Sequence, residues 1–377
     1  MLLGFGAKNI YSFREGFEVN LKLGAGCPNN ISNGKDYTNV LAIKGANASG
    51  KTNVLKVLSF LSNFTTNSFD YKLDEEIPFF NFFENTDNTH LYIIFIEDNI
   101  EYKYELELNK TKIISEKIYK KNILIIDRKN NKLLKTTKDY ADINIIKLRS
   151  NVSLISTANQ YDIDSIKTIY SLFNNIISNV GYSGMVEEFI NYKKVSELYH
   201  KEEEIFNFIK DILIKSDTGI KDIIIHEKED KETDEVTYFP IFVYEIDGVN
   251  KYLTYHEQSS GVKSLFKQLG AYKIVLNNSG VLVLDEFDIN LHPDLLPILI
   301  HFFTKNNEND AQLVFTTHNT EIMDELKKYR IIFVNKEDNE SFLYRLDEVS
   351  DEIIRNDRSL INIYNSNKVG GKPRLML

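Results

Sequence analysis

The sequence has few cysteines and no long apolar run, and each absence narrows what the chain can be. Cys27 is the single cysteine among 377 residues, so it cannot form an internal disulfide. We expect it to pack as a small hydrophobic side chain in a reducing environment. No apolar run approaches the roughly 18 residues of a membrane-spanning helix, and residues 1–4 lack the basic and apolar regions of a secretion signal. These absences predict a cytoplasmic protein without membrane spans.

Histidine is also scarce, which bears on whether the chain carries a nuclease. Seven histidines occur, and they form no zinc-like or HNH-like cluster and no arginine–histidine pair of the HEPN ribonuclease type. The carboxylates include no second acidic site convincingly like that of a Toprim nuclease. We therefore expect any nuclease or toxin activity to belong to another chain.

The overall composition is that of a globular protein with an acidic balance. Hydrophobic residues make up 42% and charged residues 27%, enough for one large α/β domain with insertions or for two ordinary domains. The net charge of −10 argues against coating of nucleic acid by the whole surface. A local basic patch remains open: Lys368, Lys372 and Arg374 lie in a tail that is either a phosphate- or acid-binding end or a solvated terminus.

A glycine-rich loop between an apolar strand and a helix is the strongest motif. Gly45 and Gly50 fit the spacing G-x-x-x-x-G-K-[ST], which lets successive backbone N–H groups point at an oxyanion. Lys51 reaches the β- and γ-phosphates, the hydroxyl of Thr52 is placed to hold Mg²⁺, and the helix adds the positive end of its dipole. The predicted nucleotide-binding residues are Gly45, Ala46, Asn47, Ala48, Ser49, Gly50, Lys51 and Thr52.

Hydrophobic periodicity predicts the elements around this loop. The N-terminal part is expected to hold two strands at 2–10 and 17–23, a loop at 24–39 and, after the glycine-rich loop, a helix from 54 onward to about 67. An antiparallel meander is expected at 91–96, 101–108, 113–119 and 123–127. Residues 162–216 have a helical period. Strands return at 221–226, 236–246 and 251–255, and the charged residues 227–235 suit a solvated hairpin tip.

The last third alternates helices and strands. Helices are expected at 261–277 and after Pro293, and strands at 281–284, 312–315 and 331–334. This alternation predicts a parallel sheet that binds its ligands at the carboxyl ends of the strands.

Two carboxylates follow the apolar strand 281–284. We expect Asp285 to face Mg²⁺ through water and Glu286 to orient or deprotonate the attacking water. A solvated acidic turn would by itself be the commoner explanation of such a run. Its position well after a phosphate-binding loop favours the catalytic interpretation.

Two further pieces lie at the start of a helix and the end of a strand. Ser259, Ser260 and Gly261 offer a second anion site made of backbone N–H groups and a hydroxyl, although alone they would be only a good helix cap. His318 ends the strand 312–315 with Thr316 and Thr317. It can hydrogen-bond a γ-phosphate, although a lone histidine there would more often be an incidental polar residue.

In this order the pieces resemble the ABC-type ATPases, with a Walker A motif, a signature, a Walker B motif, a D-loop at 288–291 that includes Asp288, and a switch histidine. The chain looks most like the AAA-family P-loop ATPases of bacterial abortive-infection and anti-phage loci, related to OLD, RecF and SMC ATPase heads and either PARIS AriA-like or Septu PtuA-like. The phrases that carry this are K-N-I-Y-S-F at 8–13, D-E-F-D at 285–288, L-H-P at 291–293, A-Q-L-V-F-T-T-H-N at 311–319, and Tyr364 with G-G-K-P at 370–373. Transporter subunits match less well, because their signature is normally L-S-G-G-Q and Ser260 and Val262 depart from it.

The resemblance implies an α/β fold of the ABC-ATPase, RecF- and SMC-head-like type, with an antiparallel β-subdomain and a helical insertion. The corresponding domains are an N-terminal ATPase lobe at 1–160, the insertion at 161–218 and a C-terminal ATPase lobe at 219–377. The sequence does not place a Q-loop glutamine. The family's equivalent region lies around Pro78, and Gln160 lies too far along the chain.

The resemblance also implies a mechanism with ATP and Mg²⁺ as cofactors. Two subunits meet head to tail, and each ATP lies between residues 45–52 of one and residues 259–261 of the other. Lys51, Thr52 and Asp285 serve the nucleotide and Mg²⁺, Glu286 is the base, and His318 senses the γ-phosphate. One monomer is then a poor ATPase, and the active form is a homodimer or a higher homo-oligomer.

The implied function is that of a sensor or scaffold in an anti-phage, toxin–antitoxin type of system. It would hold a separately encoded toxin or nuclease, of the Toprim or HNH type, and respond to a phage-encoded trigger. The alternative is a RecF- or SMC-like repair ATPase that binds DNA directly through a basic groove; the segment 162–216 is too short for an SMC-type coiled coil. A binding module with a degenerate site is disfavoured because Lys51, Asp285, Glu286 and His318 are all present.

Overall fold

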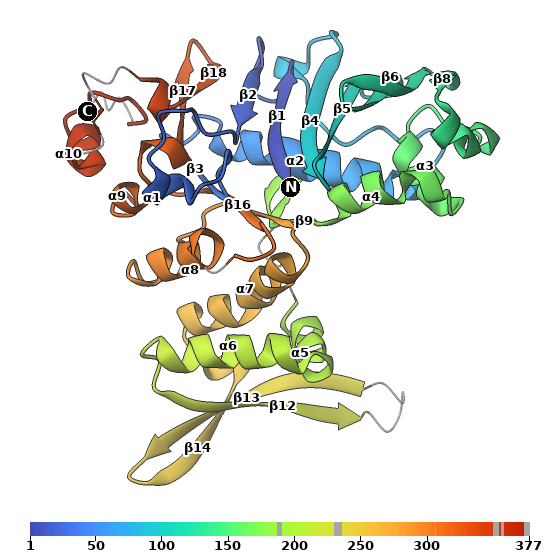
Figure 1. The fold of residues 1–377 in the computed structure, drawn as a ribbon. Helices are drawn as coiled ribbons and strands as arrows, with labels where there is room; N and C mark the ends of the chain where they lie inside the picture. The colour runs from blue at the N-terminus through green and yellow to red at the C-terminus, as the bar shows by residue number, and fades with distance from the viewer. Residues whose placement is uncertain (187–190, 230–235, 306, 350–353, 356–357, 373–377) are drawn as a thin grey trace.

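The computed structural model describes residues 1–186, 191–229, 236–305, 307–349, 354–355 and 358–372. Two sheets share the upper part of the molecule, and a smaller sheet with its helices forms the lower part (Figure 1). Among the described residues, no helix is both long and apolar enough to cross a membrane.

The first sheet is antiparallel and has seven strands in the order β2-β1-β4-β5-β6-β7-β8. Its strands are β1 (Leu2–Lys8), β2 (Phe17–Asn20), β4 (Thr89–Glu97), β5 (Ile100–Leu108), β6 (Ile113–Lys120), β7 (Ile123–Lys129) and β8 (Lys132–Thr136). Buried and partly exposed residues alternate along β5, so one face packs on the core and the other faces solvent. The meander predicted for 91–127 is therefore confirmed, and β8 extends it beyond the predicted strands.

The second sheet has the strand order β18-β17-β3-β16-β15-β9 and is parallel except for the β17–β18 pair. Its strands are β3 (Val40–Lys44), β9 (Ile176–Ser178), β15 (Val281–Leu284), β16 (Gln312–Thr316), β17 (Ile331–Glu337) and β18 (Glu340–Arg345). The predicted parallel sheet is confirmed. Because its parallel strands run the same way, their carboxyl ends meet at one edge.

Each central strand of this sheet supplies two hydrophobic cores. Leu41 and Ile43 of β3 lie in the core shared with α2 (Lys51–Asn67) and the antiparallel sheet. Val40 and Ala42 face the other core, with α7 (Ser260–Asn277) and α8 (Leu295–Thr304). The short helices of this part are α1 (Asn29–Ser32), α3 (Leu154–Gln160), α4 (Lys167–Asn174), α9 (Met323–Leu326) and α10 (Leu360–Asn365).

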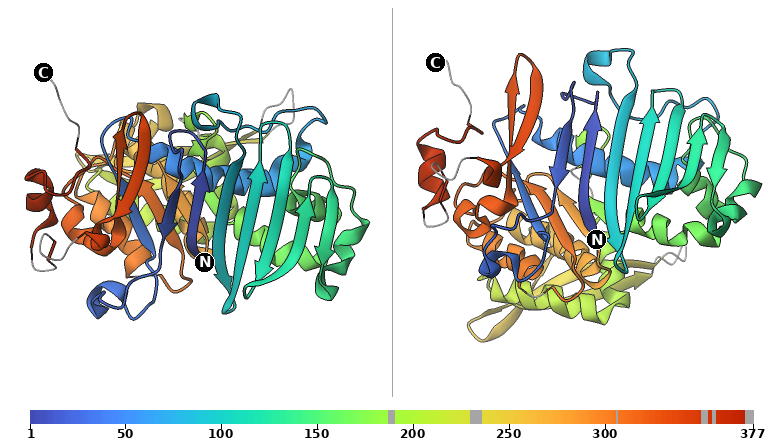
Figure 2. Two further views of the ribbon diagram at one scale, coloured as in Figure 1. Left: turned by 90° about the horizontal axis from the view of Figure 1, so that it is seen from above. Right: turned by 45° about the horizontal axis from the view of Figure 1, so that its top comes forward.

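The β17–β18 hairpin joins the two sheets. Figure 2 shows it standing beside β2 at the edge of the antiparallel sheet. Arg345 at the end of β18 donates hydrogen bonds of 2.7 Å to the carbonyls of Asn20 and Lys22. The phosphate-binding strand β3 therefore lies in a sheet that is fixed to the N-terminal sheet.

The lower part contains a three-stranded antiparallel sheet of β12 (Ile220–Glu229), β13 (Val236–Ile246) and β14 (Val249–Thr254). Helices α5 (Tyr192–Lys201) and α6 (Glu203–Lys215) lie between it and α7 (Figure 1). Tyr199 packs edge-on against Phe266, and Phe242 packs on the same ring. The three predicted strands are confirmed; residues 230–235 of the predicted hairpin tip lie outside the described residues, as do Pro373 and Arg374 of the tail.

The segment 162–216 is not wholly helical as expected. It contains β9, which pairs in parallel with β15, and a small hairpin of β10 (Val180–Gly181) and β11 (Gly184–Met185). Three residues are too few to show a strand period, and β9 is specified by its pairing with β15. The segment predicted to be a helical insertion therefore supplies an edge strand of the parallel sheet. Residues 24–39, expected to be loop, contain the short helix α1.

Candidate functional site

The glycine-rich loop connects β3 to α2 at the carboxyl edge of the parallel sheet. Gly50, the residue before α2, has φ 109°, a backbone conformation that favours glycine. A Cβ on Gly45 would lie 2.3 Å from the Val334 carbonyl oxygen and 2.5 Å from Ser49 Oγ. Both glycines of the motif are thus required by the curl of the backbone.

Hydrogen bonds of serine and asparagine side chains fix the position of this loop. The Ser341 hydroxyl lies 2.7 Å from both Ser12 Oγ and the Ser49 carbonyl oxygen. Asn53 in α2 donates a 2.9 Å hydrogen bond to Ser12 Oγ. Sequence reasoning did not assign these roles, and its only signal was Ser12 in the opening phrase.

Lys51 lies folded over the loop. Its ammonium donates to the carbonyls of Gly45 and Ala46 at 3.0 and 2.9 Å. Burial lowers the pKa of Lys51, and the charges of Asp285 and Glu286 oppose this shift. The lysine is therefore held at the loop near both carboxylates.

Asp285 connects the loop to the neighbouring strands. Thr52 donates a 2.8 Å hydrogen bond from Oγ1 to Asp285 Oδ2, across 233 positions of sequence. The Thr316 hydroxyl donates to Asp285 Oδ1 and accepts a 2.8 Å hydrogen bond from the Glu286 backbone N–H. The structure thus brings together the two residues predicted to serve Mg²⁺ and adds Thr316, which the sequence reasoning had mentioned only as the neighbour of His318.

Asn179 holds the main chain at the same point. Its Oδ1 accepts a 2.7 Å hydrogen bond from the Asp285 N–H, and its Nδ2 donates at 3.0 Å to the Asp285 carbonyl. Asn179 directly follows β9, the strand beside β15. No Q-loop glutamine was placed from the sequence; within the described part of the chain, the side-chain amide bonded to Asp285 belongs to Asn179.

The remaining charged groups gather at the same edge. Glu286 is exposed, with φ 50°. The side chain of His318 is exposed but partly desolvated by its neighbours. This desolvation and the charges of Lys51 and Lys44 lower its pKa, while Asp288 and Glu286 oppose the shift. Three cationic or basic groups and three carboxylates therefore interact where β3, β15 and β16 end.

Lys44 is the deepest of these groups. It is 1% exposed, and its ammonium donates a 2.6 Å hydrogen bond to the carbonyl of Asn319, next to His318. Burial lowers its pKa to about 8, against the raising effect of Asp288. This hydrogen bond links the end of β3 to Asn319, the residue that follows the predicted switch histidine His318.

The predicted signature residues, 259–261, lie apart from the glycine-rich loop. Ser259 caps α7 by accepting a 3.3 Å hydrogen bond from the Val262 N–H, and a Cβ on Gly261 would lie 3.1 Å from the Asn290 carbonyl oxygen. A cavity of about 770 Å³ is lined by residues 259–261 and by Asn290–Pro293 among others. Across the described residues, no hydrogen bond joins 259–261 to 45–52. Within one chain, residues 259–261 thus lie beside residues 290–293, and the glycine-rich loop lies beside Asp285.

The loop fits a phosphate group and a magnesium ion. Ser49 Oγ is buried without a hydrogen-bond partner in the described structure, and it lies inside the curl of the loop. The Thr52 hydroxyl and the Asp285 carboxylate are hard oxygen ligands of the kind that Mg²⁺ prefers. The residues present thus fit the phosphate groups and the Mg²⁺ of the predicted cofactors.

Three solved structures are similar to this chain at low sequence identity. The SmcHead bound to the C-winged helix domain of ScpA is 12% identical, covers 91% of this chain and 96% of its own, and has a TM-score of 0.50. The SMC head domain from Thermotoga maritima is 14% identical, with coverages of 91% and 98% and a TM-score of 0.47. The Smc head domain bound to the C-terminal domain of ScpA, derived from Pyrococcus furiosus, is 12% identical, with coverages of 92% and 97% and a TM-score of 0.48.

The first of these likenesses shows an α/β fold of the SMC-head, ABC-ATPase type, as the sequence predicted. A comparison with curated protein sequences gives no match. A family model described as "AAA domain, putative AbiEii toxin, Type IV TA system" matches residues 40–324, which is most of the chain. The chain belongs to this family of P-loop ATPase domains.

Proposed function

We propose that the chain is an ATP-binding and ATP-hydrolysing sensor or scaffold of a bacterial anti-phage, abortive-infection system. It closes into a dimer around ATP and controls a separately encoded toxin or nuclease. The observation that carries the ATPase part is the hydrogen bond from Thr52 to Asp285, which joins the glycine-rich loop to the Walker B strand. The toxin–antitoxin wording of the family description supports the defence part.

The chemistry follows from the groups at the sheet edge. Residues 45–50 would surround the phosphates with backbone N–H groups, and Lys51 would exchange its loop carbonyls for phosphate oxygens. Thr52 and Asp285 would hold Mg²⁺, which when bound neutralises charge on the phosphates. Glu286 would accept the proton of the attacking water, because its carboxylate is exposed beside the buried Asp285.

His318 suits a γ-phosphate sensor. Its pKa is lowered, so at neutral pH the ring is mostly uncharged and can offer a single N–H donor. Asp288 acts on both His318 and Lys44. Both groups would therefore respond when phosphate charge arrives next to them.

The second half of the site would come from another copy. In one chain the signature faces a cavity beside its own D-loop. A head-to-tail partner would place Ser259, Ser260 and Gly261, at the N-terminus of the 18-residue helix α7, against the nucleotide on the first subunit. Single chains would then hydrolyse ATP slowly.

The test is to express the gene with its chromosomal neighbours, tag this chain, and determine by native mass spectrometry what co-purifies with and without ATP. A stoichiometric neighbour whose motifs are those of a toxin or of a Toprim or HNH nuclease is the expected result. A bare homodimer that binds DNA only in the presence of ATP would instead favour a RecF- or SMC-like repair ATPase. The Lys51→Ala chain is the control, because its complexes should not depend on ATP.

A further inference from the structure

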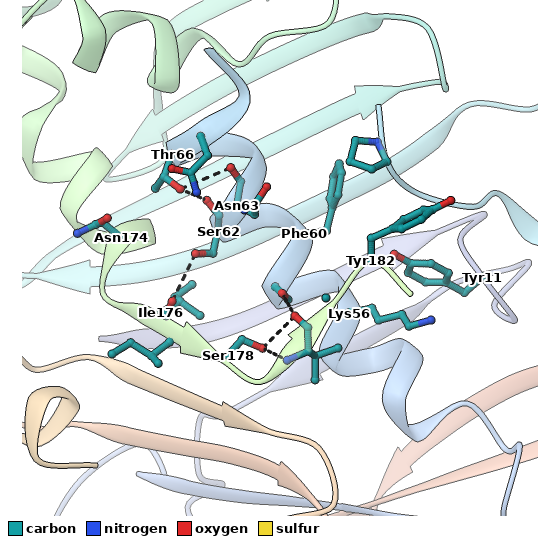
Figure 3. A pocket seen from close by; sticks show the side chains of 16 residues that line it. Tyr11, Lys56, Phe60, Ser62, Asn63, Thr66, Asn174, Ile176, Ser178 and Tyr182 are labelled. Carbon is teal, nitrogen blue, oxygen red and sulfur yellow. Dashed lines mark hydrogen bonds between the residues drawn. The ribbon is translucent and has the colours of Figure 1, made fainter. Parts of the chain in front are cut away.

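A cavity of about 550 Å³ lies on the flank of α2, beyond the residues that hold the nucleotide (Figure 3). Its walls come from α2, from the segment around β9 and β10, and from Tyr11 and Pro78. The lining side chains drawn with labels are Tyr11, Lys56, Phe60, Ser62, Asn63, Thr66, Asn174, Ile176, Ser178 and Tyr182. None of the residues assigned above to ATP or Mg²⁺ lines it.

The cavity carries one positive charge, on which the Asp285 carboxylate acts from outside the lining. Among the described residues that line it, Lys56 alone is charged. No hydrogen bond or ion pair joins the Lys56 ammonium to the described part of the chain, and Nζ lies 5.0 Å from the centroid of the Tyr11 ring. Burial lowers the pKa of Lys56 more than the charge of Asp285 raises it. A half-buried ammonium that forms no ion pair favours an anionic ligand.

Polar groups without partners extend this surface. The Tyr11 hydroxyl is buried and has no hydrogen-bond partner in the described structure. The side-chain amides of Asn63 and Asn174 likewise bond to no described residue, and Figure 3 shows them at the end of the cavity opposite Tyr11 and Tyr182. A buried hydroxyl that is left unpaired costs stability, so a ligand or water that bonds to it would be favoured.

Aromatic rings complete the lining. Tyr182 is 47% exposed and stacks by one face on Phe80, with ring centroids 4.9 Å apart and 22° between the planes. Phe60 and Tyr11 line the same end of the cavity. Rings beside a cation and free amides are the groups that hold a nucleotide, by stacking on the base, pairing with phosphate and bonding to base or sugar edges.

We propose that this cavity is a second nucleotide-binding site, with the phosphate on Lys56, the base against Tyr182 and the sugar directed toward Asn63 and Asn174 at the opposite end. Its ligand is either a free mononucleotide or the terminal nucleotide of a nucleic-acid strand. The site goes beyond the proposed ATPase function and gives it a sensor for a signal other than ATP.

The cavity is connected to the catalytic carboxylates. Ser178 and Val180 line it, and they flank Asn179, which bonds twice to the backbone of Asp285. Ser59 of α2 donates a hydrogen bond to the Val180 carbonyl across the same wall. A ligand that shifts this segment would therefore change the position of Asp285.

The absence of tryptophan from the chain makes a direct test possible. In the Lys51→Ala background, Tyr182→Trp places a single tryptophan at the cavity. Its fluorescence is titrated with AMP, GMP, CMP and UMP, and separately with a 5′-phosphorylated oligonucleotide. A saturable change with a mononucleotide identifies a free ligand, and a change with the oligonucleotide alone identifies a strand end.

Matched variants assign the response to the cavity. Lys56→Gln should weaken binding about tenfold, because a charge-assisted phosphate contact is lost. Asn63→Leu serves as a second lining variant should Lys56→Gln fold poorly. Tyr161→Trp, whose site is 50% exposed and outside the cavity, should not respond.

Two results would overturn the site: no saturable response to any of these ligands, or a response that neither Lys56→Gln nor Asn63→Leu weakens. Failure of the ATPase proposal is seen separately, as absence of ATP-dependent dimerisation in the unmodified chain.

Discussion

Lys44 is a buried cation whose protonation should affect stability. Its pKa falls from 10.5 to about 8 in the folded chain. Between these values the unfolded chain binds a proton that the folded chain has released, so the free energy of unfolding rises with pH across this window. Full titration is worth about 3 kcal/mol. The free energy of unfolding of the wild type and of Lys44→Met can be measured by chemical denaturation at about pH 7 and about pH 10. The stability of the wild type relative to the variant should be greater at the higher pH. A constant difference would mean that Lys44 keeps its ordinary pKa.

Asn179 is a positioning residue for Asp285. Asn179→Ala removes both hydrogen bonds to the Asp285 backbone, so we expect turnover of ATP to fall about tenfold, with a smaller change in ATP binding. Steady-state hydrolysis and equilibrium binding measured on the same preparation separate the two effects. Asn175→Ala is the matched control, because its side chain bonds instead to the carbonyl of Asn278. Equal turnover in the two variants would remove Asn179 from this role.

Helix α3 is fastened to the antiparallel sheet by a buried ion pair. Glu116 accepts hydrogen bonds from Arg128, from the Ser153 hydroxyl and from the Leu154 N–H at the start of α3, and both charged side chains are nearly inaccessible. Arg128→Met leaves the carboxylate buried and unpaired, so the free energy of unfolding should fall by about 3–5 kcal/mol. Chemical denaturation measures this loss.

The pair of Lys103 with Glu105 on β5 provides the comparison. Each of its side chains is 35% exposed, so Lys103→Gln should cost about 1 kcal/mol or less. A similar loss in Arg128→Met and Lys103→Gln would show that the buried pair does not fasten α3.

The elements that were predictable from sequence are those whose own residues show a period or a motif. The run at β15 is apolar throughout, and β5 alternates, so both strands were found. Strand β9 has three residues and is extended because it pairs with β15. It was missed because pairing between distant segments leaves no local pattern.

The candidate site divides in the same way. Lys51, Thr52 and Asp285 stand in spaced motifs, so their meeting could be expected. Asn179 bonds to a residue 106 positions away, and its flanking residues form no motif of their own. Such contacts are specified by the order of strands in the sheet, which the sequence did not provide.

The dimeric state should be visible when hydrolysis is blocked. Glu286→Gln keeps the Thr52–Asp285 bond but removes the proposed base, so ATP should bind while hydrolysis slows about a hundredfold. The closed dimer should then accumulate with ATP, as measured by size-exclusion chromatography with light scattering. Glu321→Gln, an exposed carboxylate close to His318 in sequence, is the control and should behave as wild type. Normal turnover in Glu286→Gln would exclude Glu286 as the base.

If each ATP site is shared between two subunits, a substitution in the signature should impair the dimer and leave single chains unaffected. Ser259 is exposed and bonds to its own helix, so Ser259→Arg should leave the fold and nucleotide binding by single chains unchanged. The added side chain would occupy the place of the partner's nucleotide, so dimerisation with ATP and the ATPase rate should both fall to the level of the monomer. Ser171→Arg, on the exposed side of α4, is the matched control.

Mixing Ser259→Arg with Lys51→Ala chains sharpens the test, because a head-to-tail mixed dimer has one site with both defects and one site with neither. Recovery of activity in the mixture is expected; unchanged activity of Ser259→Arg alone would show that each chain hydrolyses ATP without a partner's signature.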